Sequence, residues 1–111
     1  MSLAEKQCVP CRGGVDPLRR EEAQEMLGQL PDWTLSDDAG RISRAFSFKN
    51  FAEALAFVNR VGEISEKQDH HPEISFGWGH VEIEIWTHKI GGLHENDFIL
   101  AARIDGLLGQ P

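Results

Sequence analysis

The hydrophobic positions of this chain recur with two periods, one typical of helices and one typical of strands. In three segments the apolar residues are spaced three or four positions apart, which places them on one face of a helix. The first helix is expected to open at Asp16-Pro17, because Asp caps helices and Pro fits the first helical position, and Pro31 ends it. The apolar positions of the three segments are, in order, Leu18, Ala23, Met26, Leu27 and Leu30; Phe51, Ala54, Leu55, Val58 and Val61; and Phe98, Ala101, Ala102, Ile104 and Leu108.

The second and third helices also have recognisable ends. Asn50 is expected to cap the second helix, and Glu53, three residues later, would complete a capping box. This helix is predicted to run to about Gln68, since the residue before Pro72 is disfavoured in a helix. The third helix is predicted over Glu95–Leu108.

Shorter segments alternate between apolar and polar residues, as strands with one buried face do. Residues 33–35 and 42–48 are expected to pair across a turn at residues 37–40. Residues 74–78 and 81–85 form the second predicted hairpin. The resulting order, α-β-β-α-β-β-α, predicts an α+β two-layer sandwich, with a four-stranded antiparallel sheet and three helices on one face.

Size and charge narrow the picture further. With 111 residues, one domain is expected over residues 16–111, preceded by an irregular N-terminal arm over residues 1–15. Lys and Arg total 11 while Asp and Glu total 18, which disfavours a nucleic-acid or anionic-membrane partner. No apolar stretch approaches the length of a membrane span, and the N-terminus lacks the apolar core of a signal peptide, so we expect a cytoplasmic protein.

The candidate chemistry lies in a cluster of histidines. Five histidines fall between positions 70 and 94, with His70-His71 where the second helix ends and His88 where the fourth strand ends. Catalytic groups gather at such element ends, and imidazole titrates near neutral pH. Glu66 lies one helical turn before His70, and Asp69 directly precedes it. A structural or merely exposed role is the alternative for each of these residues, and it is the favoured reading for His80 and His94.

Other chemistries are less well supported by the residues. Cys8-x-x-Cys11 is half of a zinc site or a redox pair, and a reduced pair on an arm is at least as good an interpretation. Adjacent histidines at a helix end rarely bind one ion, so no metal is expected. Glycine-rich phosphate loops and nucleophile elbows are also missing from the sequence. Trp86 shares the outward parity of the strand residues Glu82 and Glu84, where it could cover a pocket or a subunit contact.

These residues resemble the pterin-4a-carbinolamine dehydratase family over about residues 17–108. The family pattern has a charged residue, three residues, His-His-Pro, about five residues, an aromatic, nine residues, His, and then Asp some eight residues later. This chain supplies the whole pattern with Glu66, His70-His71-Pro72, Trp78, His88 and Asp97.

The resemblance implies dehydration of 4a-hydroxytetrahydrobiopterin to a quinonoid dihydropterin in tetrahydropterin recycling, with no cofactor. It also implies a homodimer or homotetramer and an aromatic amino-acid hydroxylase as a pathway partner. By position, the catalytic residues would be His70, His71 and His88, with Glu66 to orient an imidazole. The residues implied to bind the pterin are Asp69, Pro72, Trp86, Thr87 and Asp97.

Three alternatives remain open from the sequence. The chain could dehydrate or bind another pterin, for instance a molybdopterin-related one. It could be a non-catalytic dimerisation or interaction module, which needs an exposed apolar surface rather than an intact histidine site. It could also bind metal through Cys8, Cys11 and histidines.

Overall fold

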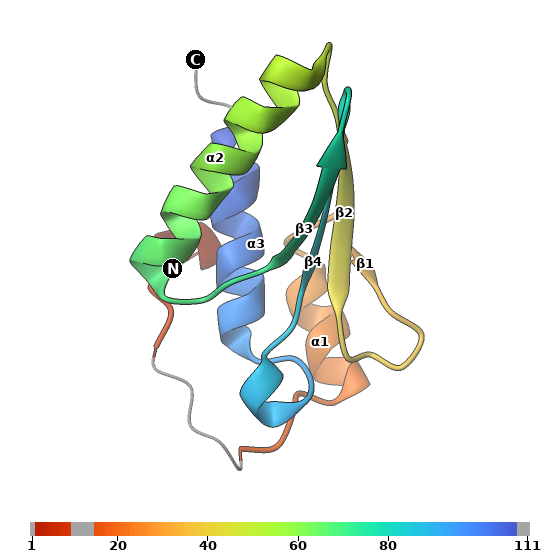
Figure 1. The fold of residues 1–111 in the computed structure, drawn as a ribbon. Helices are drawn as coiled ribbons and strands as arrows, with labels where there is room; N and C mark the ends of the chain where they lie inside the picture. The colour runs from red at the N-terminus through yellow and green to blue at the C-terminus, as the bar shows by residue number, and fades with distance from the viewer. Residues whose placement is uncertain (1, 10–14, 109–111) are drawn as a thin grey trace.

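A computed structural model describes residues 2–9 and 15–108 of the chain (Figure 1). One layer is a four-stranded antiparallel sheet and the other contains three helices, which confirms the predicted α+β order. Two short 3₁₀ helices, η1 and η2, flank these elements. Their bounds are η1 Leu3–Glu5, α1 Arg20–Leu27, β1 Thr34–Leu35, β2 Ile42–Ser47, α2 Phe51–Gln68, β3 Glu73–Gly77, β4 His80–Ile85, η2 His88–Ile90 and α3 Glu95–Leu107.

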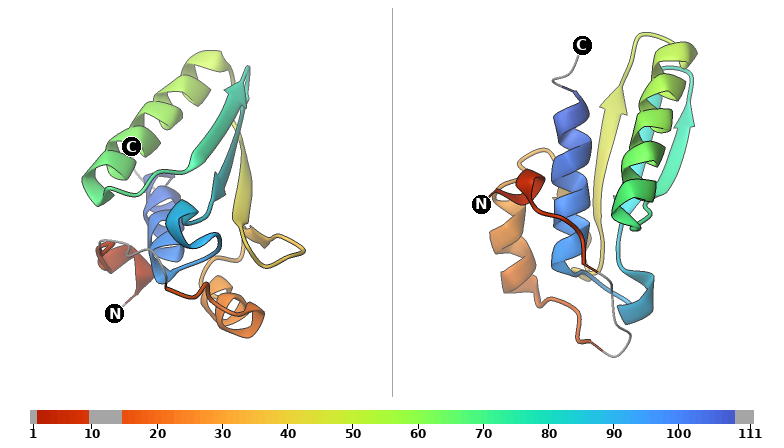
Figure 2. Two further views of the ribbon diagram at one scale, coloured as in Figure 1. Left: turned by 60° about the horizontal axis from the view of Figure 1, so that its bottom comes forward. Right: turned by 90° about the vertical axis from the view of Figure 1, so that its left-hand side faces the viewer.

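The sheet has the strand order β1-β2-β4-β3, so β1 and β3 are its edges. Ile42 of β2 lies opposite Ile85 of β4, and Phe46 lies opposite Val81, which brings buried residues together on the face that the helices cover. Figure 2 shows α2 and α3 running along this face. The opposite face is polar, and its central strand contributes Glu82 there.

Helix α2 buries Ala54 and Val61 as expected, but its buried stripe is shifted around the helix from the expected one. Its buried residues are Ala54, Phe57, Val61 and Ser65. Phe51 and Leu55, which the spacing also placed on the apolar face, are 46% and 39% exposed. The apolar surface of α2 is wider than the part that the sheet and α3 cover, so Phe51 and Leu55 in its first two turns remain exposed.

The first helix starts later than predicted, at Arg20 rather than at Asp16-Pro17. Arg19 caps it, and its backbone N–H donates to Glu22 Oε1 at 2.9 Å. Pro17 instead packs against Gly92, where an added Cβ would meet the Pro17 side chain at 2.7 Å. This tertiary contact holds Pro17 outside the helix and overrides the local capping signal.

The described part of the N-terminal arm, residues 2–9, is folded against the rest of the chain. It contains η1, which packs against α3, and Leu3 is 4% exposed within the hydrophobic core (Figure 2). Helix α3 has an unusual cap, since the His94 Nδ1 atom accepts a hydrogen bond from the Asn96 N–H at 3.1 Å. The imidazole thereby caps the helix N-terminus, a role that a Ser or Thr side chain has more often.

Candidate active site

The C-terminus of α2 turns the chain so that two histidines leave the helix together. Asp69, the C-cap, has a left-handed backbone with φ of 50°, a conformation that Asp tolerates better than most residues. The His70 N–H donates to the Ser65 carbonyl at 3.1 Å, which closes the helix end. This reversal aims the two histidines toward the start of α3 and the end of β4.

His70 is held by a buried carboxylate. Its Nε2 lies 2.5 Å from Oδ1 of Asp97, and the two side chains are 10% and 0% exposed. The other oxygen, Oδ2, accepts hydrogen bonds from the Thr87 hydroxyl and from the His94 N–H, both at 2.9 Å. In the described part of the chain, no buried side-chain nitrogen or oxygen lacks a partner. His70 therefore has a fixed position.

Asp97, expected among the pterin-binding residues, contacts His70 in the structure. Both of its oxygens are occupied by His70, Thr87 and His94, and it does not line the neighbouring cavity. Sequence spacing placed Asp97 correctly in the motif, but only the packing of α3 against the end of α2 determines that it faces His70. It enters the site as a partner of the imidazole.

His71 is held differently, by an exposed carboxylate of α2. Its Nε2 bonds to Oε2 of Glu66, and the two side chains are 55% and 78% exposed. Glu66, expected to orient an imidazole, contacts that of His71, while the imidazole of His70 faces Asp97.

His88 begins η2 and stacks on Trp86. The two ring centroids are 4.3 Å apart with an interplanar angle of 27°. The Arg41 guanidinium lies over the same indole, 4.1 Å from its centroid. Glu73 Oε1 is 3.9 Å from His88 Nε2. Trp86 thus stacks on the His88 ring. The outward parity of Trp86 in the sequence did not predict this contact.

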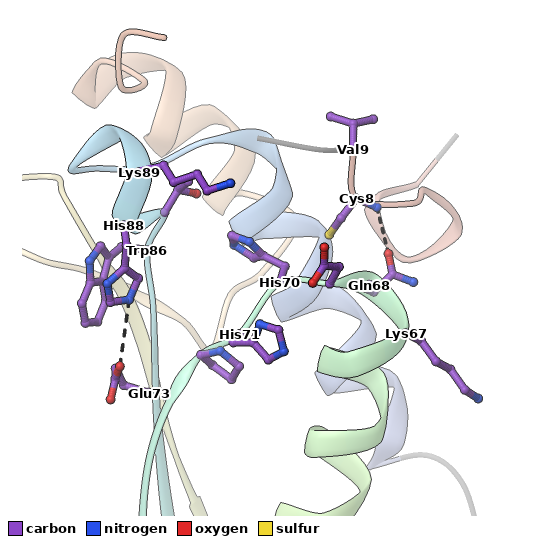
Figure 3. Close-up of a pocket in the computed structure, with 13 residues that line it drawn as sticks. Cys8, Val9, Lys67, Gln68, His70, His71, Glu73, Trp86, His88 and Lys89 are labelled. Atoms are coloured by element: carbon purple, nitrogen blue, oxygen red, sulfur yellow. Dashed lines mark hydrogen bonds and ion pairs between the residues drawn. The ribbon is translucent and has the colours of Figure 1, made fainter. Parts of the chain in front are cut away.

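These side chains surround a cavity of about 520 Å³, a size typical of small-molecule sites (Figure 3). Figure 3 shows Trp86 and His88 on one side of it and His70 and His71 on the other. Seven of the expected site residues line it: Asp69, His70, His71, Pro72, Trp86, Thr87 and His88. Glu66, like Asp97, is not among the lining residues.

Sequence reasoning missed part of the cavity wall. Cys8 and Val9 line it from the N-terminal arm, and Glu73 and Lys89 line it beside His88. Neighbours of the motif such as Glu73 could have been proposed from their positions. Nothing in the local sequence indicates that the arm reaches this cavity.

The metal alternative concerns Cys8, Cys11 and the histidines. Across residues 2–9 and 15–108, no group of three or more His, Cys, Asp or Glu side chains is placed to hold a metal ion. Cys11 lies outside the described residues, so the Cys8/Cys11 pair is not tested. Among the described helices, none is both long and apolar enough to cross a membrane.

The fold and the cavity together define a class: a small two-layer α+β protein whose histidines, carried at the ends of a helix and a strand, face one ligand-sized pocket. Residues 16–107 match the family described as "Pterin 4 alpha carbinolamine dehydratase", and the chain belongs to this family. The sequence resemblance is therefore confirmed.

Individual relatives agree with this assignment. The chain is 59% identical to a protein of Halorhodospira halophila named "Putative pterin-4-alpha-carbinolamine dehydratase", over 96% of this chain and 98% of the relative. A protein of the same name from Rubrobacter xylanophilus is 57% identical, over 95% and 97%.

Two solved structures are also similar. One is a "transcriptional coactivator/pterin dehydratase" from Brucella melitensis, with a TM-score of 0.79 and 32% identity over 85% of this chain and 100% of that one. The other is a pterin dehydratase-like protein identified as a RuBisCO assembly factor in the alpha-carboxysome, with a TM-score of 0.61 and 27% identity over 72% of this chain and 93% of that one.

Proposed function

We propose that this protein dehydrates 4a-hydroxytetrahydropterins to quinonoid dihydropterins by histidine acid–base catalysis, as a step in tetrahydropterin recycling. The observation that carries the proposal is the convergence of His70, His71 and His88 on one cavity, each beside a carboxylate. Family membership supplies the substrate class.

The reaction requires two proton transfers that imidazoles suit. The bond between C4a and its hydroxyl oxygen breaks, and a general acid protonates that oxygen so that water leaves. A general base takes the proton from N5, and the electron pair left on N5 forms the C4a–N5 double bond. Each such transfer contributes about 10²–10⁴-fold to the rate.

The hydrogen bonds support an assignment of the ring nitrogen that carries the hydrogen in His70 and His71. An ionised carboxylate can only accept hydrogen bonds, so the hydrogen shared with Asp97 belongs to Nε2 of His70. In neutral His70 the free lone pair is then on Nδ1, which is the nitrogen left to accept a proton from a ligand. The same logic gives His71 a hydrogen on Nε2 toward Glu66. His88 has the weakest carboxylate contact of the three, at 3.9 Å.

The direct test follows the decay of enzymatically generated 4a-hydroxytetrahydrobiopterin by ultraviolet absorbance. Wild type should accelerate the decay strongly, and His70→Ala and His71→Ala should each lose about 10²-fold or more of that acceleration. His80→Ala is the matched control, because His80 is exposed on β4 and does not line the cavity. A folded wild-type protein with no effect on the decay would disprove the proposal for this substrate, and reduced molybdopterin precursors would be assayed next.

A homo-oligomeric state is also proposed, on the basis of the uncovered apolar surface. Phe51 and Phe76 are 46% and 37% exposed with their ring centroids 5.7 Å apart, and Leu55 and Trp78 are 39% and 73% exposed. Exposed apolar side chains that gather in this way favour a protein contact. Light scattering after gel filtration should give a dimer or tetramer mass, and Phe51→Ser with Phe76→Ser should shift it toward the monomer. A wild-type monomer would contradict this proposal.

The same surface favours the interaction-module alternative, in which this chain binds another protein without catalysis. The two similar structures carry such roles in their names, coactivator and assembly factor. The decay assay separates the alternatives, because a module that only binds a partner has no reason to accelerate dehydration.

A further inference from the structure

Residues 2–9, which we call the docked arm, are fixed to α3 along their length. Leu3 is buried in the core, at 4% exposure. The Lys6 carbonyl accepts two hydrogen bonds from the Arg103 guanidinium, from Nε at 2.9 Å and from Nη2 at 2.6 Å. The Lys6 ammonium also lies 2.9 Å from Glu95. The docked arm is therefore part of the folded domain.

Asn96 fastens the end of the docked arm. This side chain belongs to a residue only 2% exposed, and its amide makes two hydrogen bonds to one backbone residue. The Val9 N–H donates to Asn96 Oδ1 at 2.9 Å, and Asn96 Nδ2 donates to the Val9 carbonyl at 2.7 Å. These two bonds take the place of those that a neighbouring strand would make with Val9. A buried amide left without them would be costly, so the arm and Asn96 depend on each other.

A second fastening lies one residue earlier. The Cys8 N–H donates to Gln68 Oε1 at 2.8 Å. Gln68 stands two residues before His70, and Asn96 stands directly before Asp97. The docked arm is thus attached to the two segments that bring His70 and Asp97 together.

The fastened residues form one wall of the candidate active site. Cys8 and Val9 both line the cavity that contains the histidines (Figure 3). The Cys8 thiol contacts the Asn96 carbonyl at 3.5 Å. Burial, with the nearby Asp97 charge, raises the pKa of this thiol from 9.0 to about 11, so the thiol is neutral at physiological pH. The neutral Cys8 thiol gives this wall apolar surface.

We propose that the docked arm is a substrate-binding wall of the pterin cavity and that Asn96 is the positioning residue that holds it in place. This inference rests on the proposed function. The arm lies outside residues 16–107, the part of the chain that the family match covers. Releasing the arm would remove apolar surface from beside a flat heteroaromatic ligand but leave the His70–Asp97 pair intact. Weaker pterin binding, with a smaller effect on turnover, is the expected signature.

The first experiment measures whether Asn96 holds the arm, without any pterin. The Cys11→Ser variant leaves Cys8 as the single thiol, and its reaction with 5,5′-dithiobis(2-nitrobenzoic acid) is followed at pH 8. A released thiol with the ordinary pKa of 9.0 holds roughly 90-fold more thiolate at this pH than one with a pKa of about 11. Adding Asn96→Ala should therefore raise the labelling rate at least tenfold. Asn59→Ala, at an exposed position of α2, is the matched control and should leave the rate unchanged.

The second experiment measures what the wall does. Asn96→Ala should raise the KM for 4a-hydroxytetrahydrobiopterin, and the Kd for the fluorescent pterin biopterin, about tenfold, with kcat within about threefold of wild type. Fast labelling of Cys8 with unchanged KM and Kd would contradict the proposal that the docked arm is a substrate-binding wall. Slow labelling in Asn96→Ala would overturn the role of Asn96.

A second variant guards against a folding defect in Asn96→Ala. Val9→Pro deletes the N–H that donates to Asn96 and leaves the buried start of α3 unaltered. It should reproduce the faster labelling and the weaker pterin binding. If wild type binds biopterin but lacks dehydratase activity, the proposed function fails. The Kd for biopterin then still tests the proposal that the docked arm is a substrate-binding wall. If wild type binds no pterin, both proposals fail.

Discussion

His70 and His71 are neighbours in the sequence, yet the structure holds them in opposite ways. His70 is 10% exposed and bonds to Asp97, which also binds Thr87 and the backbone of His94. His71 is 55% exposed and bonds only to a carboxylate that is itself 78% exposed. The imidazole of His70 is part of a buried hydrogen-bond network, whereas that of His71 lies at the surface. His70 should therefore contribute to the stability of the fold as well as to catalysis.

Replacement of Asp97 should have the largest effect. Asp97→Ala leaves three donors, on His70, Thr87 and His94, without their acceptor. Since an unsatisfied buried group costs about 1–3 kcal/mol, we expect unfolding to become easier by about 3 kcal/mol or more in urea titrations. Activity should be lost together with the position of His70.

Asp97→Asn separates the two roles of this carboxylate. The amide oxygen can still accept from Thr87 and His94, so about 1 kcal/mol of stability should be lost. The amide nitrogen would face His70 Nε2 and force the imidazole to accept there, which moves its hydrogen to Nδ1. Activity should fall about 10²-fold or more in a protein that remains folded. Full activity in this variant would contradict the assignment of Nδ1 as the acceptor.

Replacement of the exposed His71 should change activity but not stability. His71→Ala is expected to lower kcat about 10²-fold and to change the free energy of unfolding by less than about 0.5 kcal/mol. His70→Ala should lower both quantities. Equal stability losses in the two variants, measured by urea titration, would show that burial does not distinguish these histidines.

Removal of the Trp86 indole that stacks on His88 should have a smaller effect on activity. Trp86→Ala removes the stacking partner 4.3 Å from the His88 ring, and stacking of this kind contributes about 0.5–1.5 kcal/mol. We expect kcat to fall about two- to tenfold, because about 1.4 kcal/mol corresponds to a factor of ten. Trp86→Phe keeps an aromatic face and should recover most of the rate. An unaffected Trp86→Ala enzyme would place His88 outside the chemistry.

The last expected effect is a pH dependence of stability that is confined to alkaline pH. The pKa of Cys8 rises from 9.0 to about 11 on folding, so the unfolded chain releases this proton first as the pH increases. The stability that the protonated thiol contributes is complete below pH 9 and is lost between pH 9 and 11. Urea titrations across this range should show a steeper decline for Cys11→Ser than for Cys8→Ala/Cys11→Ser. The chain has no Tyr to titrate in this window.

The sequence alone determined the elements of this protein and the positions of its histidines. Helix α2 ends at Gln68, as its pattern predicts, and both hairpins form where the alternation indicates them. Helical and strand periods, caps and turn residues are local signals, and they act through backbone geometry within a few residues. His70 and His71 therefore had to emerge together from the end of α2.

Only the tertiary structure decided which carboxylate each imidazole binds and what closes the cavity. His70 and Asp97 are 27 positions apart, and Val9 and Asn96 are 87 positions apart. Packing also delayed the start of α1, through the contact of Pro17 with Gly92, and left Phe51 exposed. Periodicity states which face of an element is apolar, but not which residue meets it from a distant segment. That depends on how the layers pack, and packing is a property of the whole chain.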